Sequence, residues 1–320
     1  MESVPLFIGP DLSFGSSAGG PFGTRRVQPA NEGAPATRKP DWLKVRLPSH
    51  GDFFRVSDLL ESRHLHTICR SARCPNIGHC WERKTATFLI LGDTCTRDCG
   101  FCAVAKGVPS APDADEPGRV AEAACALGLR YVVLTSVTRD DLPDGGASHF
   151  ARTVRAVREA SPGTKVEALI PDFGGDEQAL ETVLEAGPDV LNHNLETVES
   201  LYPKIRRPRE GYRRSLGVLE AAKRRGARTK SGLMIGLGEA EEDILGAFAD
   251  LRRAGCDLLT LGQYLQPAAV NPPVERYYAP GEFEALRTKA LELGFWEVVA
   301  GPLVRSSFEA EHLYETVQER

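Results

Sequence analysis

The residues best suited to chemistry in this chain are cysteines. Six of its eight cysteines fall between Cys69 and Cys102, in two sets of three: a first triad, Cys69-x4-Cys74-x5-Cys80, and a second triad, Cys95-x3-Cys99-x2-Cys102. Thiolates are soft ligands that suit zinc or iron–sulfur clusters. A closed zinc site or an ordinary four-iron cluster takes four protein ligands. Three cysteines therefore leave one metal position open, where a small molecule can bind and react.

The sequence around the second triad predicts where it lies in the fold. The run from Thr85 to Leu91 is apolar and typical of a buried strand, and Gly92 ends it. Residues 95–102 are then expected in a loop at the C-terminal end of a first strand. That end is where α/β barrels hold their reactive groups.

Strands and helices alternate over the rest of the chain. The predicted strands are 85–91, 131–137, 165–170, 189–195, 229–237 and 257–265, and the predicted helices are 57–69, 119–129, 150–160, 177–186, 212–225, 241–254 and 282–293. Six strand–helix units in a row favour a parallel sheet covered by helices. Six fall short of the eight units of a closed barrel. We expect an α/β fold, a partial (β/α)6 TIM-type barrel, with an open side that admits a protein-bound substrate.

The remaining segments flank this barrel, which we assign to residues 85–295. Residues 1–37 are rich in Gly, Pro, Ser and Ala and are predicted to be a mobile tail. Residues 38–84 form an extension that carries the first triad, and 296–320 form a C-terminal segment that is strand-like up to residue 308. In the extension, Trp42, Leu43, Val45 and Leu47 are candidates to pack an arm on the body. Its basic residues, Arg38, Lys39, Lys44 and Arg46, either meet an acidic partner or stay solvated.

Composition excludes several classes of protein. The 320 residues are 42% hydrophobic and 26% charged, as in a soluble globular protein with a sizeable core. A net charge of −5 does not favour nucleic-acid binding. No apolar run reaches the roughly 18 residues of a membrane span, and the N-terminus lacks the order of a secretory signal. Cysteines at ligand spacing fit a reducing compartment better than a disulfide framework. We expect a cytoplasmic protein.

Local sequence around both triads resembles one enzyme family. An aromatic residue, Phe101, precedes the last cysteine of C-x3-C-x2-C, as in radical S-adenosylmethionine (SAM) enzymes, and this resemblance makes Phe101 a candidate SAM contact. The first triad, with PNIGHCW around Cys80, is similar to that of the lipoyl synthase family. The resemblance covers roughly Lys39 to Phe308. The alternative of a structural zinc ribbon lacks the paired C-x2-C knuckles of such sites.

The resemblance implies a reaction and its cofactors. Each triad would hold one four-iron–four-sulfur (4Fe–4S) cluster. The cluster on the second triad would cleave SAM to a 5′-deoxyadenosyl radical, which takes hydrogen from carbons 6 and 8 of an octanoyl group. The auxiliary cluster on the first triad would be consumed as the source of two sulfur atoms. No side chain has a pKa suited to deprotonating such a carbon, so a cofactor must supply the chemistry.

The resemblance also implies partners. The octanoyl group would sit on a lysine of a lipoyl carrier domain, in a 2-oxoacid dehydrogenase acyltransferase subunit or the glycine cleavage H protein. Such domains are usually acidic, which suits the basic arm. Ferredoxin or flavodoxin would deliver electrons, and an iron–sulfur carrier would repair the consumed cluster. No nucleic acid or membrane partner is expected.

Polar residues at the predicted strand ends are candidate SAM contacts. Asn194 and Glu196 lie two residues apart, on one face of a strand, and could grip the two ribose hydroxyls. Arg213 belongs to a basic run that spans 206–214, and we predict that it binds the SAM carboxylate, because its planar guanidinium suits that group. Lys230 opens KSGLMIGLGE, a string that matches the family.

Other polar residues near the barrel leave two interpretations open. Glu167 is a charge inside an apolar run and needs a partner, as either a paired barrel residue or a ligand contact. The polar cluster 136–142 is a helix-capping turn or, by resemblance, part of the active-site rim. Cys125 and Cys256 are interpreted as small core residues rather than ligands.

The C-terminal Arg305-Ser-Ser-Phe308 completes the resemblance. In lipoyl synthases this motif is Arg-Ser-Ser-Tyr, and its second serine is the fourth ligand of the auxiliary cluster. Carried over, that residue is Ser307. Phe308 departs from the pattern by losing a phenol hydroxyl. Without the resemblance, two serines near a C-terminus predict a turn.

Two rival functions remain at this stage. A biotin synthase-like sulfur-inserting radical enzyme would share the second triad but not PNIGHCW or the terminal serines. A non-enzymatic electron carrier would bind two clusters but would be much smaller and would need no open iron.

Overall fold

The computed structural model describes residues 39–45 and 51–317. The predicted tail, Arg38, Arg46 and Leu47 lie outside these residues. The described residues belong to one compact unit. Within the arm, Leu43 is buried, whereas the side chains of Trp42 and Val45 are 44% and 47% exposed.

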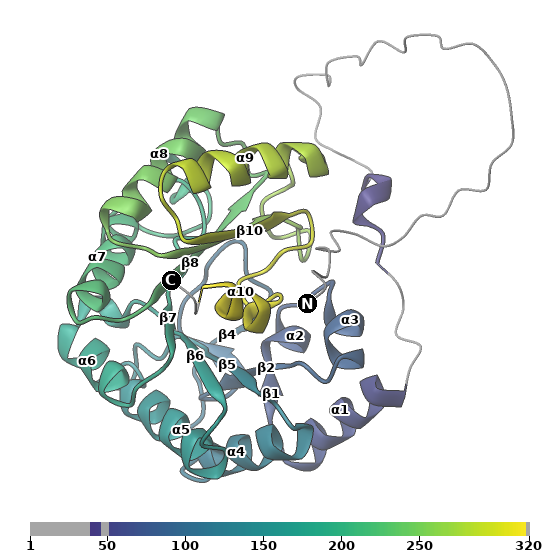
Figure 1. The fold of residues 1–320 in the computed structure, drawn as a ribbon, viewed down its shortest axis with the longest axis vertical. Coiled ribbons are helices and arrows are strands. Elements are labelled where there is room, and N and C mark those ends of the chain that lie inside the picture. Colours follow the sequence, from purple (N-terminus) through teal and green to yellow (C-terminus); the bar gives the residue numbers. More distant parts are fainter. Residues whose placement is uncertain (1–38, 46–50, 318–320) are drawn as a thin grey trace, which may run out of the picture. The chain divides into compact units, whose positions relative to one another are not determined.

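One sheet organises this unit (Figure 1). Its eight strands run in the order β1-β2-β5-β6-β7-β8-β9-β10. Their bounds are His66–Thr67, Thr87–Ile90, Tyr131–Ser136, Lys165–Leu169, Val190–Asn192, Thr229–Ile235, Leu258–Gln263 and Glu297–Gly301. Only β1 is antiparallel to its neighbour, and all the other pairings are parallel. The partial barrel predicted from the alternation is confirmed, with β10 as one more parallel strand at its edge.

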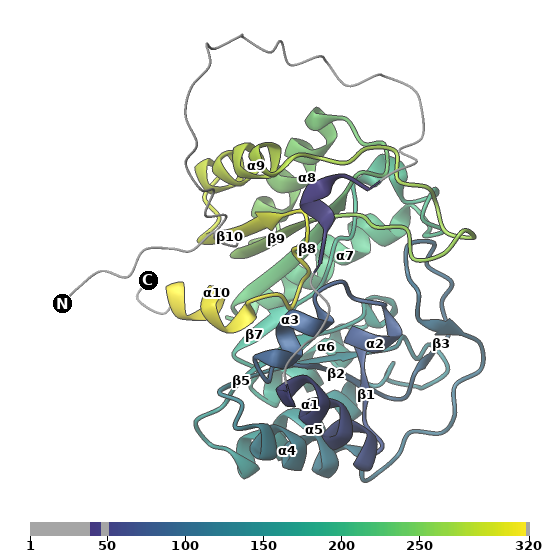
Figure 2. The same ribbon diagram turned by 90° about the vertical axis from the view of Figure 1, so that its right-hand side faces the viewer.

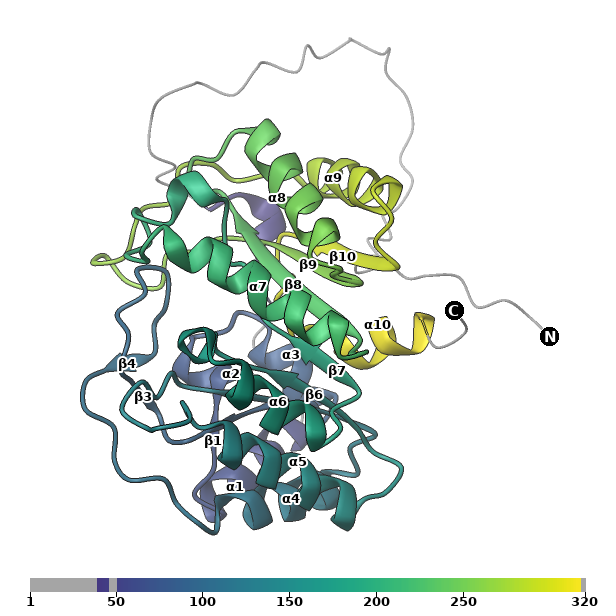
Figure 3. The ribbon, with the colours of Figure 1, turned by 90° about the vertical axis from the view of Figure 1, so that its left-hand side faces the viewer.

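Helices cover the outer face of this sheet, as Figures 1 and 3 show for α4 to α8. The α-helices α4 to α9 are Glu116–Leu127, Ala147–Ala160, Glu177–Glu185, Glu210–Arg224, Glu241–Arg253 and Pro280–Glu292. The 3₁₀ turns η1, η2 and η3 are Asp41–Leu43, Phe173–Gly175 and Glu199–Leu201. Alternation along the strands sets the two faces. In β5, Val132 and Leu134 join the apolar cluster under the helices. Tyr131 and Val133 face the other way.

The extension packs beside the β1 edge (Figure 2). It holds α1 Gly51–Ser62, α2 Ile68–Ser71 and α3 Ile77–Glu82. The predicted helix over 57–69 is wrong: the helix ends at Ser62, and His66 and Thr67 pair with Leu89 and Phe88 of β2 instead. This pairing is a tertiary contact, so the helical spacing of leucines before Cys69 could not reveal it.

The last helix, α10 (Ala310–Thr316), lies on the inner face of the sheet (Figure 1). Leu313 and Tyr314 pack there with Tyr131, Val133 and other inward residues of the strands. Val304 to Glu309 connect β10 to this helix. The C-terminal segment is therefore anchored on both sides of Ser307.

This anchoring predicts the effect of one core substitution. Leu313 is 1% exposed, so Leu313→Ala should lower the free energy of unfolding by about 2–5 kcal/mol. Thermal unfolding followed by circular dichroism measures the change. Leu293, which is 43% exposed, provides the control, since Leu293→Ala should change stability by no more than about 0.5 kcal/mol. Equal effects of the two substitutions would contradict the packing of α10.

Candidate active site

The second triad lies in a loop after β2, as predicted. Two short strands, β3 (Thr94–Cys95) and β4 (Ala105–Lys106), close the base of this loop. The Cys95 sulfur accepts hydrogen bonds from the backbone N–H groups of Arg97 (3.4 Å) and Thr138 (3.3 Å). These two hydrogen bonds fix the position of the Cys95 sulfur at the base of the loop.

Charged residues hold this loop against the neighbouring strand ends. Arg97 donates twice to Asp140, at 2.8 and 2.7 Å, and pairs with Asp172 at 2.7 Å. Asp140 belongs to the polar cluster 136–142, which thus anchors the cysteine loop. Burial opposes ionisation of Asp172, but hydrogen bonds and charge from Arg97 outweigh it and lower the pKa of this carboxyl. Arg207 and Arg214 also lie near Asp172, at 3.9 and 3.6 Å.

The far end of the loop is fixed by Gly100 and Phe101. The Gly100 N–H donates to the Ile205 carbonyl (2.7 Å), and Asn271 donates to the Gly100 carbonyl (2.6 Å). A Cβ at Gly100 would lie 3.1 Å from the Ile205 backbone, so a glycine suits this approach. Phe101 packs against an apolar cluster that includes Ile205 and Tyr264. The aromatic residue before Cys102 therefore anchors the loop, and its assignment to the cofactor stays a prediction.

The three thiols of the second triad influence one another. Burial, with the charges of Cys102 and Cys95 as minor contributors, raises the pKa of Cys99 to about 11. Burial likewise raises the pKa of Cys102. Without metal these thiols hold their protons, and binding a cluster would release them. The converging thiols fit a cluster site.

Asn194 and Glu196 lie beside this loop, but not on a strand. Strand β7 ends at Asn192, and Glu196 has a left-handed backbone with φ of 72°. Burial raises the pKa of the Glu196 carboxyl, while Arg207 and a side-chain hydrogen bond from Asn194 partly offset this. The expected amide–carboxylate pair is thus formed by a turn. His193, which precedes Asn194, is buried, and its ring nitrogens hydrogen-bond the Ile170 carbonyl and the Ser215 hydroxyl.

The basic run after β7 divides into exposed and inward-facing arginines. Arg213 is largely exposed, at 79%, and pairs with Glu199 at 3.6 Å. Arg207 is 10% exposed, and its charge partly offsets the rise that burial causes in the pKa of both Cys99 and Glu196. The structure therefore brings Arg207, rather than Arg213, to the second triad. Both belong to the same basic run, and only burial separates them.

Glu167 and Lys230 form a buried ion pair on the inner face of the sheet. The ammonium lies 3.0 Å from both carboxylate oxygens. Tyr131 and Asn192 each donate to this carboxylate at 2.7 Å. A buried charge needs a partner, and this pairing supplies one for both residues. A SAM contact by either residue stays a prediction.

The first triad lies on α2, α3 and the turn between them. Thr67 caps α2 by accepting from the Cys69 N–H, and Cys74 N–H donates to the Cys69 carbonyl. Burial, with the charges of Cys69 and Cys74 adding to it, raises the pKa of Cys80 to about 12. Burial and Cys69 also raise the pKa of Cys74. The three thiols thus face one another as a second set.

The C-terminal segment lies against this first triad. Asn76 donates to the Leu303 carbonyl (2.6 Å), and the rings of His79 and Phe308 are 5.9 Å apart. Burial lowers the pKa of Arg305, and the positive charge of Arg305 partly offsets the rise that burial causes in the pKa of Cys74. Residues on both sides of Ser307 therefore reach the extension, 200 residues away in the sequence. Phe308, which replaces the tyrosine of the family motif, packs on a triad helix.

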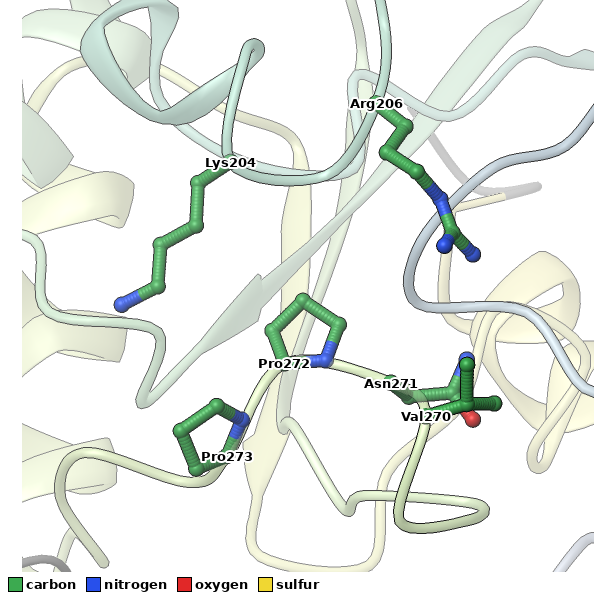
Figure 4. Close-up of a pocket in the computed structure, with 6 residues that line it drawn as sticks. All are labelled: Lys204, Arg206, Val270, Asn271, Pro272 and Pro273. Atoms are coloured by element: carbon green, nitrogen blue, oxygen red, sulfur yellow. The ribbon is translucent and has the colours of Figure 1, made fainter.

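A cavity of about 390 Å³ borders the second triad loop (Figure 4). Lys204 and Arg206 extend from one loop on one side, and Val270 to Pro273 form the opposite side. Asn271 connects this wall to Gly100. Lys204 pairs with Glu275 at 2.7 Å and Arg206 with Asp98 at 3.2 Å, so these cations are already balanced.

Two further observations concern metal ligands. Within residues 39–45 and 51–317, no three His, Cys, Asp or Glu side chains are arranged around a single metal ion. A 4Fe–4S cluster binds each cysteine through a different iron.

Cys256 is buried, as expected of a core residue, but Cys125 is exposed and its sulfur lies 2.9 Å from Ser161 Oγ. The interpretation of Cys125 as a core residue is wrong.

Comparisons with known proteins define the class and then the family. The model of the Radical SAM superfamily matches residues 89–260, from β2 to β9. The fold and the site are thus those of a radical SAM enzyme. The chain is 54% identical to lipoyl synthase of Chlorobaculum parvum over 284 residues, covering 88% of this chain and 97% of that protein. It is 55% identical to lipoyl synthase of Thermus thermophilus over 285 residues, covering 88% of each. The chain belongs to the lipoyl synthase family of sulfur-inserting enzymes.

Solved structures support the fold alone. Streptococcus suis SuiB, in a crystal structure bound to S-adenosylmethionine, has a TM-score of 0.53 and 12% identity, covering 76% of this chain and 56% of that one. Across the residues that the structure describes, every helix is too short or too polar to span a bilayer.

The charge network around Asp172 predicts a pH-dependent effect. Because the folded state lowers the pKa of Asp172, its contribution to stability is present above the unfolded value of about 3.9 and is lost as pH falls. Asp172→Asn should lower the free energy of unfolding by roughly 3 kcal/mol at neutral pH, and the difference from wild type should shrink only as pH falls below about 4. Urea denaturation at a series of pH values measures this.

The exposed pair of Asp113 with Arg119 provides the control for this series. Asp113→Asn should change the urea midpoint little at any pH, because solvent screens that pair. A stability difference between Asp172→Asn and wild type that is the same at all pH values would contradict an ionised Asp172 as the anchor of Arg97.

Proposed function

We propose that the chain inserts two sulfur atoms at carbons 6 and 8 of an octanoyl group carried on a lysine of a lipoyl carrier protein. The observation that carries this proposal is the packing of the Arg305–Phe308 segment against the first triad. A generic radical SAM enzyme needs only the second triad. A serine delivered to a second set of three cysteines suits a second cluster with a special task.

The residues present fit two clusters. In each triad the thiols converge, and burial keeps them protonated until metal replaces the protons. Arg305 places a guanidinium beside Cys74, where the negative charge of three thiolates would compensate it. Cys95, Cys99 and Cys102 would hold one 4Fe–4S cluster, and Cys69, Cys74, Cys80 and Ser307 the auxiliary one.

Each part of the site then has a stated role. When bound, the cluster on the second triad supplies the electron that splits SAM into methionine and a 5′-deoxyadenosyl radical. Asn194 and Glu196 would hold the ribose, and Arg207 would bind the carboxylate of SAM through its planar fork. The anchors at Arg97, Gly100 and Phe101 keep the cysteine loop in one geometry. The auxiliary cluster is the sulfur substrate, and it is consumed.

Ser307 would suit a cluster that must come apart. A serine oxygen is a harder ligand than a thiolate and a poorer match for iron bridged by sulfide. It should leave more readily and release that iron when sulfur is withdrawn. The neighbouring residues stay fixed by α10 and by Asn76, so the segment keeps its place.

The partners follow from this chemistry. The substrates would be octanoylated carrier domains of 2-oxoacid dehydrogenase complexes and of the glycine cleavage H protein. A low-potential donor, ferredoxin or flavodoxin, would reduce the cluster, and an iron–sulfur carrier would rebuild the auxiliary cluster. Lys39 and Lys44 of the arm are exposed, although Lys44 also pairs with Asp41 at 2.7 Å, and an acidic carrier could dock there.

Sulfur insertion into an octanoyl-lysine peptide, followed by mass, tests the proposal. The cluster-loaded protein with SAM and dithionite should release 5′-deoxyadenosine and add two sulfur atoms to the peptide. Release of 5′-deoxyadenosine without any sulfur in the peptide would overturn the proposed substrate. A protein that releases none would not be a radical SAM enzyme under these conditions.

Substitutions in the second triad should abolish SAM cleavage. Cys95→Ala, Cys99→Ala or Cys102→Ala each removes a ligand of the cluster that delivers the electron. Release of 5′-deoxyadenosine measures the loss. Cys125→Ala is the matched control, because Cys125 is exposed and outside both triads, and it should cleave SAM at the wild-type rate.

Substitution of Ser307 should separate the two half-reactions. Ser307→Ala should keep SAM cleavage but lower sulfur insertion at least about tenfold, since metal sites lose that much when their ligands are disturbed. Paired assays of 5′-deoxyadenosine and thiolated peptide measure both. Normal thiolation by this variant would remove Ser307 from the ligand set.

A further inference from the structure

The first serine of the C-terminal pair contacts the SAM side of the site. The Ser306 hydroxyl donates to Asn194 Oδ1 at 2.7 Å, a contact between residues 112 apart in the sequence. Asn194 in turn hydrogen-bonds Glu196. Ser306 immediately precedes Ser307, the proposed ligand of the auxiliary cluster. Two adjacent residues of the chain thus belong to the two halves of the proposed site.

The sheet leaves room for this contact at one glycine. A Cβ at Gly232 would lie 2.7 Å from both Asn194 Oδ1 and Ser306 Oγ, and 2.9 Å from Thr260 Oγ1. Any side chain at this position of β8 would displace the two partners. The bare backbone of Gly232 is therefore what allows the C-terminal segment to reach Asn194.

The hydrogen bond from Ser306 also sets the orientation of the Asn194 amide. An asparagine side chain has one accepting end and one donating end, and its hydrogen bonds decide which way each points. Because Ser306 donates to Oδ1, the Nδ2 end is directed elsewhere, where it can donate to Glu196 and to a ligand hydroxyl. A carboxylate acceptor and an amide donor side by side match the two hydroxyls of a ribose.

We propose that Ser306 is a positioning residue that fixes the Asn194 amide for SAM and ties the SAM pocket to the segment that carries Ser307. This inference rests on the proposed function, in which Asn194 and Glu196 bind the ribose. In this role Ser306 contacts neither a cluster nor SAM, and it acts through Asn194. Since coupling between two sites is reciprocal, occupancy by SAM also steadies the residue next to the cluster ligand.

Binding of radiolabelled SAM to oxidised, cluster-loaded protein tests this without turnover. Ser306→Ala should raise the dissociation constant for SAM roughly three- to tenfold, as expected for loss of one hydrogen bond, with wild-type iron and sulfide content. Ser306→Thr keeps the hydroxyl and should restore tight binding. An unchanged dissociation constant in Ser306→Ala, with both clusters loaded, would overturn the proposal.

A double-mutant cycle with Asn194→Ala separates positioning from general packing. If Ser306 acts through Asn194, Ser306→Ala should have no further effect on SAM binding in the Asn194→Ala background, because the two effects are not additive. Full additivity of the two effects would overturn the proposal. If Ser306→Ala does not load its clusters, Gly232→Ala tests the same contact, because its Cβ would crowd both Asn194 and Ser306. Wild-type affinity for SAM in Gly232→Ala would also overturn the proposal.

These binding assays use no octanoyl substrate. Failure of the proposed function, seen as absence of sulfur in the peptide with the wild-type protein, is therefore distinguishable from failure of this inference, seen in the affinity for SAM.

Discussion

The passage of the C-terminal segment along the inner face of the sheet is the constraint on which the rest of this structure depends. Two glycines in neighbouring strands allow it. A Cβ at Gly262 would overlap the Val304 carbonyl oxygen, and one at Gly232 would crowd Ser306. Beyond them, α10 packs on the inward residues of β5 and β7. A segment from the end of the chain is thereby held beside cysteines near its beginning.

Burial and charge give the two triads a common chemical character. Burial raises the pKa of Cys80 and Cys99 well above that of a free thiol, so each triad holds protons that a cluster would displace. Arginines supply the compensating positive charge: Arg305 beside Cys74, and Arg207 beside Cys99. The anchoring differs between them. Strand-end charges hold the second triad, whereas short helices and the C-terminal segment hold the first.

The sequence allowed prediction of the features that depend on local pattern. The alternation of strand-like and helix-like segments predicted the parallel sheet, and the apolar run that ends at Gly92 predicted the loop after β2. The features that depend on tertiary contacts were not predicted from the sequence. The strand pairing of His66 and Thr67 replaced a predicted helix. Arg207 and Arg213 are alike in sequence and differ only in burial. Asp172 follows the third barrel strand, and its polar side chain at a strand end was the one sign in the sequence that it lies near the site. Nothing in the sequence indicated the contact between Ser306 and Asn194.

We expect the cluster on the first triad to supply the sulfur and the cluster on the second triad to generate the radical. Protein reconstituted with heavy-isotope sulfide, freed of excess sulfide and allowed one turnover with an octanoyl-lysine peptide, tests this most directly. Both sulfur atoms in the peptide should carry the heavy isotope, even with light sulfide in the buffer, and iron should be lost only from the first triad. Light sulfur in the peptide, with both clusters intact, would contradict it.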